Sequence, residues 1–346
     1  MRPELSNTLK TYNTEITKKT KSSADAEELK HLSNLVEANI ALMAKERQST
    51  PQAQRLIYGY QKEKRAIIQK LKKHLRRVDN GQETQEAGQR VSYTGGRLFL
   101  PDNKARDISV SELMTDGEWG VDYVLDATVP TRIKKRYLVE RAKRRLRDLL
   151  DWQIFVDELS SEATDPGKHH AYEELMKTRE NRDEGAAGHI AEKMVRNFLR
   201  KLAMDHELEY EVIPGDVYQD VHQKIDFIIQ KKSRVRYAKV SEGKTAVGIQ
   251  FTINPSPFTR FQKRKQIGIA AKIARGEEIV DDILLVQMPL TDIRKMYDTW
   301  KRAGSPPGGP DKLWDDKTKE IVFRGVMDQF LSPEEIETTW HVAVSR

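Results

Sequence analysis

The chain has 346 residues with no cysteine, and its 60 Lys and Arg against 53 Asp and Glu give a formal net charge of +7. The lack of cysteine excludes disulfide-stabilised folds, cysteine-ligated zinc sites and thiol nucleophiles. The polar first residues predict no secretory leader, and no apolar run approaches the roughly 18 residues of a membrane span. We therefore expect a cytoplasmic protein without a membrane partner, with about two domains.

The N-terminal part has the pattern of two helices. Apolar side chains recur at three- and four-residue steps over 23–47, and again after Thr50-Pro51, a typical helix start. The short polar turn between them predicts an antiparallel helical hairpin over 1–77. The segment 78–90 contains glycine and glutamine and almost no large apolar side chains, so we predict a linker there.

Residues 91–183 are predicted to form a small strand region followed by a long basic helix. Two short β-patterned runs flank Gly95-Gly96, which is typical of a hairpin. The long helix spans about 130–159, and its first half is strongly basic. That half is either a face for a polyanionic partner or an ordinary helix whose charges are balanced by salt bridges.

From residue 184 onwards, helices alternate with strands. The predicted elements are a helix at 188–206, strands at 209–213, 223–230 and 246–254, a helix at 257–275 and a strand at 282–288. This α-β-β-β-α-β order predicts an α/β domain over 184–303, in which helices flank a central sheet. A glycine- and proline-rich run then leads into a helical extension over 304–346.

Two carboxylates in this domain stand out from their apolar surroundings. Asp226 lies within a strand that otherwise belongs in a core. Burying an unpaired carboxylate costs several kcal/mol, so a core strand that carries one indicates a metal, a partner or a reaction; the solvated face of an edge strand is the alternative. On the preceding helix, Glu192 falls at the border of the apolar stripe. It either reaches over the sheet or pairs with a neighbour such as Arg196.

The strand at 246–254 alternates two kinds of side chain. One set is apolar, and the other is Gly248, Gln250, Thr252 and Asn254. The two-residue period of a strand places the second set on one face. A merely solvated face would carry the Lys, Glu or Arg that this chain has in abundance. The small polar groups therefore predict a surface that a ligand approaches closely, with a polar edge strand as the alternative.

Together these elements resemble the PD-(D/E)XK nuclease superfamily, with its restriction-endonuclease-like fold, over about 184–290. In that family a helix that often carries a glutamate precedes the sheet, an aspartate lies on the second strand, and a Glu/Gln-x-Lys follows on the third. The resemblance implies that Glu192, Asp226 and Gln250 hold Mg²⁺ or Mn²⁺, which prefer oxygen ligands. It also implies that the metal activates water for attack on a phosphodiester.

The chain departs from the family pattern at Thr252, which stands where the family has its lysine. A threonine supplies no positive charge to a scissile phosphate, so either the lysine comes from another position or the site is inactive. The candidate lysines are Lys224, Lys244, Lys263 and Lys265. Asp216 and Asp220 are candidates for the carboxylate that Gln250 does not provide.

Cations bracket the candidate site. The helix at 257–275 opens with cations interleaved with aromatic residues, and its N-terminus directs amide groups outward. The segment 231–244 is basic as well. A solvated basic surface is the alternative for either run taken alone. The residues predicted to contact nucleic acid are Arg260, Lys263, Arg264, Lys265, Arg234, Arg236 and Lys244.

The sequence thus predicts an α/β protein with a restriction-endonuclease-like core, an N-terminal helical hairpin and additional helices. We expect it to bind DNA, with RNA as a second candidate partner, and to cleave DNA as a Mg²⁺-dependent endonuclease. The predicted catalytic residues are Asp226, Gln250, Glu192, Thr252 and Lys224. The alternatives are a catalytically inactive nuclease-fold protein that binds nucleic acid or acts as a scaffold, and a helical adaptor with an unrelated α/β domain. An oligomer of this chain is a further candidate assembly.

Overall fold

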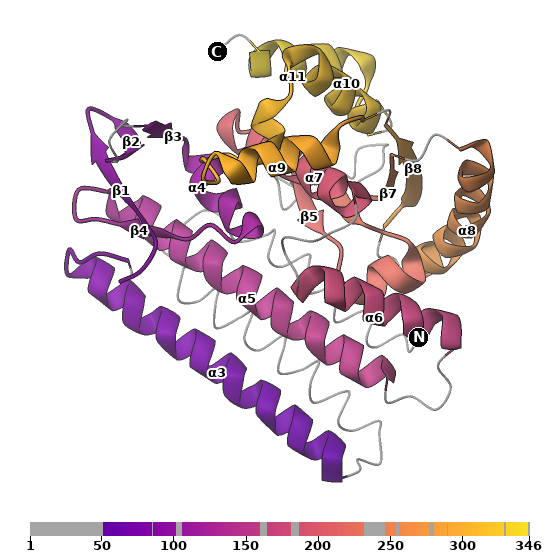
Figure 1. The fold of residues 1–346 in the computed structure, drawn as a ribbon, viewed down its shortest axis with the longest axis horizontal. Helices are drawn as coiled ribbons and strands as arrows, with labels where there is room; N and C mark the ends of the chain where they lie inside the picture. The colour runs from indigo at the N-terminus through magenta and orange to yellow at the C-terminus, as the bar shows by residue number, and fades with distance from the viewer. Residues whose placement is uncertain are drawn as a thin grey trace, which may run out of the picture. The chain divides into compact units, whose positions relative to one another are not determined.

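The computed structural model divides into two compact units, Met1–Ile154 and Phe155–Arg346. It describes residues 51–84, 86–101, 106–159, 165–180, 187–231, 246–253, 256–276, 280–288, 290–328 and 330–344, whose fold is drawn in Figure 1. The first predicted helix of the hairpin, 23–47, lies outside these residues. Within the described ranges, no helix combines the length and apolar character that crossing a membrane requires.

The first unit combines two long helices with a small sheet. Its elements are α3 (Pro51–Asp79), β1 (Gln89–Thr94), β2 (Arg97–Leu100), β3 (Arg106–Ile108), α4 (Val110–Thr115), η1 (Asp116–Trp119), β4 (Tyr123–Leu125) and most of α5 (Thr131–Leu159). The strand order is β3-β2-β1-β4, with β1 antiparallel to β2 and parallel to β4. The predicted hairpin is confirmed, and Gly95 and Gly96 both have the positive φ that a tight hairpin turn requires. The segment predicted as a linker begins with the last turn of α3 and ends in β1.

The basic half of α5 is largely balanced by acids of its own unit. Arg141 and Arg144 both pair with Asp122, at 3.1 and 3.7 Å, and Arg147 donates to Glu118 at 2.9 Å. These partners lie in and just after η1, in the segment that precedes α5. The structure therefore favours the salt-bridged interpretation of this helix over a free cationic face.

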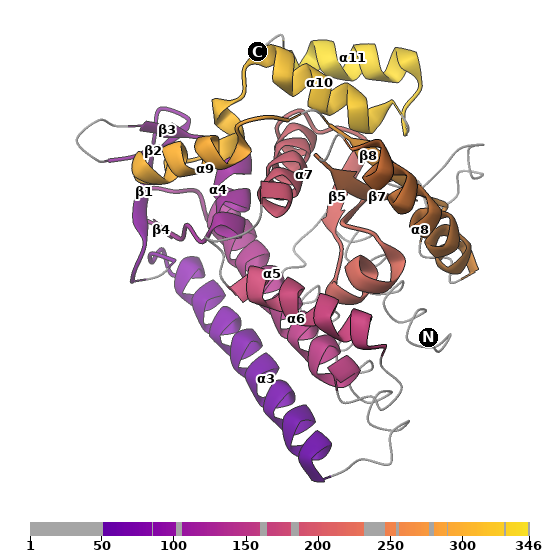
Figure 2. The same cartoon turned by 45° about the vertical axis from the view of Figure 1, so that its right-hand side comes forward.

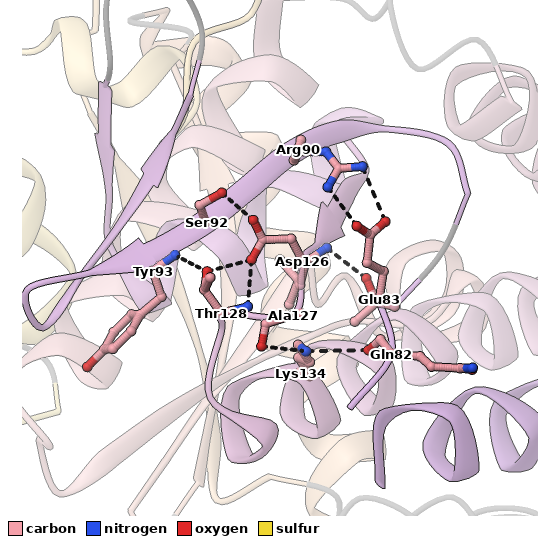
Figure 3. A network of polar contacts seen from close by, with 11 residues as sticks. Gln82, Glu83, Arg90, Ser92, Tyr93, Asp126, Ala127, Thr128 and Lys134 are labelled. Carbon is pink, nitrogen blue, oxygen red and sulfur yellow. Dashed lines mark hydrogen bonds and ion pairs between the residues drawn. The ribbon is translucent and has the colours of Figure 1, made fainter. Parts of the chain in front are cut away.

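A polar network joins β1, β4 and the start of α5, as Figure 3 shows. Asp126 accepts hydrogen bonds from the hydroxyls of Ser92 and Thr128 and from the Thr128 backbone. Burial raises the pKa of Asp126, but these hydrogen bonds outweigh it and hold the pKa below its ordinary value. Nearby, the buried Lys134 donates to the carbonyls of Gln82 and Ala127, both at 3.4 Å. The network fixes where α5 starts relative to the sheet.

The second unit contains a mixed sheet with helices on both sides. Its elements after α5 are α6 (Pro166–Glu180), α7 (Ala187–Asp205), β5 (Tyr210–Pro214), η2 (Gln219–Gln223), β6 (Phe227–Lys231), β7 (Ala246–Thr252), α8 (Pro257–Gly276), β8 (Asp282–Gln287), α9 (Ile293–Arg302), η3 (Pro310–Leu313), α10 (Asp316–Met327) and α11 (Pro333–Val344). The strand order is β5-β6-β7-β8, in which the first two pairs are antiparallel and β7 and β8 are parallel. The predicted α/β class is confirmed at this coarse level.

Helices α7 and α8 lie on opposite sides of this sheet (Figure 2), α7 against β5 and β7 and α8 against β8. On the α8 side, Ile225, Ile228 and Ile283 form a buried cluster with Ile267 and Ala270 of α8. The amphipathic pattern of each helix thus matches the sheet face that it covers. The order α7-β5-β6-β7-α8-β8 follows the predicted sequence of elements.

Two local predictions were wrong. The predicted strand 223–230 begins only at Phe227, because residues 219–223 form a π-helical turn and Lys224 is left-handed with φ 57°. The alternative interpretation of β7 as a polar edge strand was wrong as well, because β7 is a central strand between β6 and β8 and its polar side chains are buried. A Cβ built at Gly248 would lie 3.0 Å from the Ile225 side chain, and Gln250 and Thr252 are 7% and 6% exposed.

Candidate functional site

Asp226 is held at the start of β6, beside the centre of the sheet. Its backbone N–H donates to the Ile249 carbonyl at 2.8 Å, and its Oδ2 accepts from the Phe251 N–H at 2.5 Å. In the register of the two strands Phe227 faces Ile249, so one further step places Asp226 opposite Gln250. Residue 226 is therefore held by one backbone and one side-chain hydrogen bond to the neighbouring strand, opposite the predicted site residue Gln250.

The electrostatic surroundings of Asp226 disfavour its charged form. Burial raises its pKa well above the ordinary value, and the nearby carboxylates of Glu192 and Asp220 raise it further. The Phe251 N–H and the positive charge of Lys263 act in the opposite direction. Three acidic side chains thus share one neighbourhood, in which an added cation would relieve the repulsion between them.

Glu192 has partners of its own on α7. Its Oε1 accepts from the Arg196 guanidinium at 3.0 Å, and its Oε2 lies 3.7 Å from His189 Nδ1. The predicted pairing with Arg196 is therefore present. Because Glu192 also raises the pKa of Asp226, the same side chain contributes charge to the site.

Gln250 supplies a buried oxygen without a protein partner. Its side chain is buried in the middle of β7, and its Oε1 has no hydrogen-bond donor in the structure. An unsatisfied buried acceptor costs about 1–3 kcal/mol, so native proteins rarely keep one without a ligand, water or ion nearby. Amide oxygens are ordinary ligands of hard cations, which makes this atom a candidate ligand.

Lys263 is a candidate lysine for which the structure shows a contact with β7. From α8 the Lys263 Nζ donates to the Phe251 carbonyl at 3.2 Å. The backbone N–H of Phe251 in turn donates to Asp226. Lys224 instead turns its Nζ to the Val221 carbonyl at 2.8 Å, and burial lowers its pKa. Lys265 is exposed, and Lys244 lies outside the described residues, as do Arg234 and Arg236.

Asp216 and Asp220 differ in what their carboxylates do. Asp216 Oδ1 accepts from the Gln219 N–H at 2.7 Å, and Gln219 Oε1 accepts from the Asp216 N–H at 3.0 Å. This reciprocal capping pair starts the turn that leads into η2 and occupies Asp216 structurally. Asp220, which directly follows Gln219, is close enough to raise the pKa of Asp226.

An aromatic cluster beside η2 escaped the sequence interpretation. His222 stacks on Tyr218, with ring centroids 4.5 Å apart, and its Nδ1 lies 3.2 Å from Lys168 Nζ. Burial and the charges of Lys168 and Lys224 lower the pKa of His222 to about 4. The imidazole is therefore neutral at pH 7 and packs on Tyr218. Its contact with Lys168, 54 residues earlier in the sequence, exists only in the folded unit.

The donor set fits a hard divalent cation. Asp226 and Gln250 offer oxygens on adjacent strands, and Glu192 adds a second carboxylate to the neighbourhood. Mg²⁺ keeps several waters and commonly takes only one or two protein carboxylates together with substrate phosphates. Among the residues that the structure describes, no cluster of three or more acidic or histidine side chains has metal-binding geometry.

Comparisons of the chain with protein-family models, with curated proteins and with solved structures find no significant match. The chemistry of the site is therefore argued from its own residues. Asp226 and Gln250 belong to the β6–β7 pair, which Lys263 contacts from α8. Thr252 lies buried two residues beyond Gln250. The charge of Glu192 on α7 acts on Asp226.

Gly215 is predicted to be necessary for this geometry. Its N–H donates to the Asp226 carbonyl at 3.0 Å, and a Cβ built on it would lie 2.4 Å from the Ile225 carbonyl oxygen. Because that contact is with backbone, Gly215→Ala should lower the free energy of unfolding by about 1–3 kcal/mol. Urea denaturation measures the loss. The matched control is Gly268→Ala on the exposed side of α8, where a Cβ meets nothing within 4 Å. Equal stability of the two variants would show that a Cβ at residue 215 does not clash with the Ile225 carbonyl.

Proposed function

We propose that the second unit contains a nuclease-like core, over about 187–288, that hydrolyses DNA phosphodiesters with Mg²⁺ or Mn²⁺. One observation carries the proposal: the partly buried Asp226 stands opposite Gln250, whose Oε1 has no hydrogen-bond partner, and the Lys263 ammonium contacts the next residue of β7, Phe251. The order α7-β5-β6-β7-α8-β8 supports the resemblance to the PD-(D/E)XK superfamily.

The protein's own residues have distinct roles in this proposal. Asp226, Gln250 and Glu192 would hold the cation, which when bound supplies Lewis-acid stabilisation of the phosphate and a more acidic water. The Phe251 N–H keeps Asp226 in place, so that the carboxylate needs no reorganisation. The raised pKa of Asp226 means that proton and cation compete for one carboxylate.

Lys263 is proposed to take the place of the lysine that Thr252 replaces. Lys263→Met should reduce the cleavage rate at saturating DNA by about 10²–10³-fold, because one fixed charge at a developing anion contributes about 3–4 kcal/mol. Lys263→Arg should restore part of the rate, since it keeps the charge. The matched control is Lys295→Met on α9, an exposed lysine that should leave the rate unchanged. Equal rates for Lys263→Met and the control would remove Lys263 from the site.

A catalytically inactive protein that binds nucleic acid through the same fold is the second candidate. Thr252 favours it, because this side chain is buried and carries no charge at the position of the family's lysine. The two candidates share the binding step and differ only in cleavage.

Cleavage of a panel of duplex, branched and single-stranded DNA, with Mg²⁺ and with Mn²⁺, tests the proposal. The wild-type protein is compared with Asp226→Ala on every substrate, and affinity is measured across a salt series. Cleavage that disappears in the variant supports the endonuclease. Salt-dependent binding without cleavage supports the inactive candidate. Cleavage at equal rates by both proteins contradicts the assignment of Asp226.

A further inference from the structure

Helix α8 has two opposite faces of unlike chemistry. Ile267, Ala270 and Ala271 are buried against the sheet. On the opposite side Phe258 is 71% exposed, Phe261 65% and Ile269 60%. These exposed positions follow helical spacing, so they form one stripe with Lys265 between them, called here the outer face of α8 (Phe258, Phe261, Lys265 and Ile269). Two phenylalanines this exposed on one face indicate a binding partner.

The charge of α8 narrows the choice of partner. Its 20 residues include six Lys and Arg and no acidic residue. Arg264 and Lys265 are exposed next to the phenylalanines, so the apolar stripe lies within positive potential. A second copy of the same face would bring like charges together, which disfavours self-association through it. The partner that fits is anionic and carries apolar, flat groups.

Resting on the proposed function, we propose that the outer face of α8 binds the unpaired bases of single-stranded nucleic acid. Phe258 and Phe261 stack on successive bases, and Arg264 and Lys265 contact the phosphates between them. Base–aromatic stacking contributes about 1–3 kcal/mol per base and requires bases that are not already stacked inside a duplex. The substrate class assigned to the nuclease-like site is therefore DNA with a single-stranded segment, such as a fork, flap or overhang.

The same helix connects this face to the site. Lys263 lies on the packed side of α8, where its Nζ reaches the Phe251 carbonyl beside Asp226. Phe261 and Arg264 are its near neighbours in the sequence, on the exposed side. A strand that stacks along the first turns of α8 thus binds the helix that carries Lys263, on the side facing away from the sheet.

Fluorescence anisotropy with labelled oligonucleotides of about 16 nucleotides tests the proposal. EDTA is present, so cleavage does not contribute. The expected result is that Phe258→Ala/Phe261→Ala weakens binding of the single strand by about 30-fold or more, which corresponds to two stacked bases. Binding of a blunt duplex should change by less than about twofold. Phe258→Leu/Phe261→Leu should lose affinity as the alanine variant does, because leucine keeps apolar area but cannot stack.

The control is Ile321→Ala on α10, an exposed apolar residue on a helix that also carries acidic side chains. Circular dichroism and thermal unfolding confirm that each variant is folded. An equal loss for duplex and single strand overturns the proposal. So does phenylalanine-dependent binding to phosphatidylserine vesicles without binding to oligonucleotides, or phenylalanine-dependent dimerisation.

The two proposals fail in different ways. Asp226-dependent cleavage of blunt duplex, with single-strand affinity insensitive to the phenylalanines, overturns this inference and leaves the endonuclease standing. Phenylalanine-dependent single-strand binding without cleavage leaves this inference standing and overturns the endonuclease. Absence of any nucleic-acid binding overturns both.

Discussion

Asp226→Asn should strongly reduce the rate of cleavage and at the same time make the folded protein more stable at neutral pH. Loss of the carboxylate removes an anionic ligand of the cation, and several kcal/mol of transition-state stabilisation corresponds to about 10²–10³-fold in rate. The asparagine Oδ1 still accepts from the Phe251 N–H, so the position of residue 226 is kept. Cleavage assays and thermal unfolding of the same preparations measure both effects.

The stability effect depends on pH in a defined direction. Burial and the charges of Glu192 and Asp220 raise the pKa of Asp226, so the folded state holds this proton more tightly than the unfolded chain does. The contribution of Asp226 to stability is complete below pH about 4, the ordinary value for aspartate, and is lost as pH rises through the higher folded-state pKa. The stability advantage of Asp226→Asn should therefore grow between pH about 4 and the folded-state pKa of Asp226, and stay constant at higher pH.

Above that range we expect the variant to be more stable by about 1 kcal/mol or more, or by about 2–4 °C in Tm. Asp298→Asn on α9 is the control, since Asp298 lies near the surface and pairs only loosely with Arg294 at 3.5 Å. A variant that is less stable than wild type at every pH would show that the carboxylate is structural and would contradict its role as a ligand.

Divalent cations should reverse the order of stability. Binding to the folded state alone raises the free energy of unfolding by about 2.7 kcal/mol at 100 times the Kd. Mg²⁺ and Mn²⁺ should thus raise the Tm of the wild-type protein and leave Asp226→Asn nearly unchanged. Equal shifts for both proteins would place the cation elsewhere. The readout does not depend on cleavage, so it also applies if the protein is catalytically inactive.

The sequence predicted most elements of the second unit because their signals are local. The apolar periodicities of α7 and α8 and the alternation in β7 appear in the residues themselves. The π-helical turn at η2 left no such signal, because the reciprocal Asp216–Gln219 bonds and the left-handed Lys224 replace the strand that the apolar run suggested. The charge balance of α5 was hidden for another reason, since Asp122 and Glu118 meet it only in the folded unit.

The candidate site was predictable in part. Asp226 carried a local signal, because it is an acid within an apolar run. That Gln250 Oε1 is buried without a hydrogen-bond partner can be seen only in the folded sheet. The choice of Lys263 over Lys265 was open to sequence reasoning. Lys263 lies four residues before the buried Ile267 and thus on the packed side of α8, while Lys265 shares the outer face with Phe261. Helical spacing separates a lysine that faces the sheet from one that faces solvent.

Lys201→Met should cause the largest loss of stability in the second unit, about 3–5 kcal/mol. Lys201 Nζ lies 2.5 Å from Asp311 Oδ2 and also donates to the Gly308 carbonyl, and both side chains are buried. This pair fastens the glycine- and proline-rich turn to α7, and Trp300 Nε1 adds a hydrogen bond to the Pro306 carbonyl at 2.8 Å. Removing the lysine alone leaves a buried carboxylate without its counter-charge. Urea and thermal unfolding measure the loss, with Lys295→Met as the exposed control.

The double variant Lys201→Met/Asp311→Leu decides whether that loss comes from the uncompensated charge. With both charges removed, the desolvation cost of each ion disappears as well, and apolar replacements of buried pairs are often neutral or stabilising. The double variant should therefore be more stable than Lys201→Met alone, which corresponds to a favourable coupling in the double-mutant cycle. Additive losses would mean that the turn is held by packing of Trp314 against Phe198, whose ring centroids are 5.8 Å apart, and not by the ion pair. Because α7 carries both Lys201 and Glu192, the same measurement shows how firmly the helix beside the candidate site is anchored.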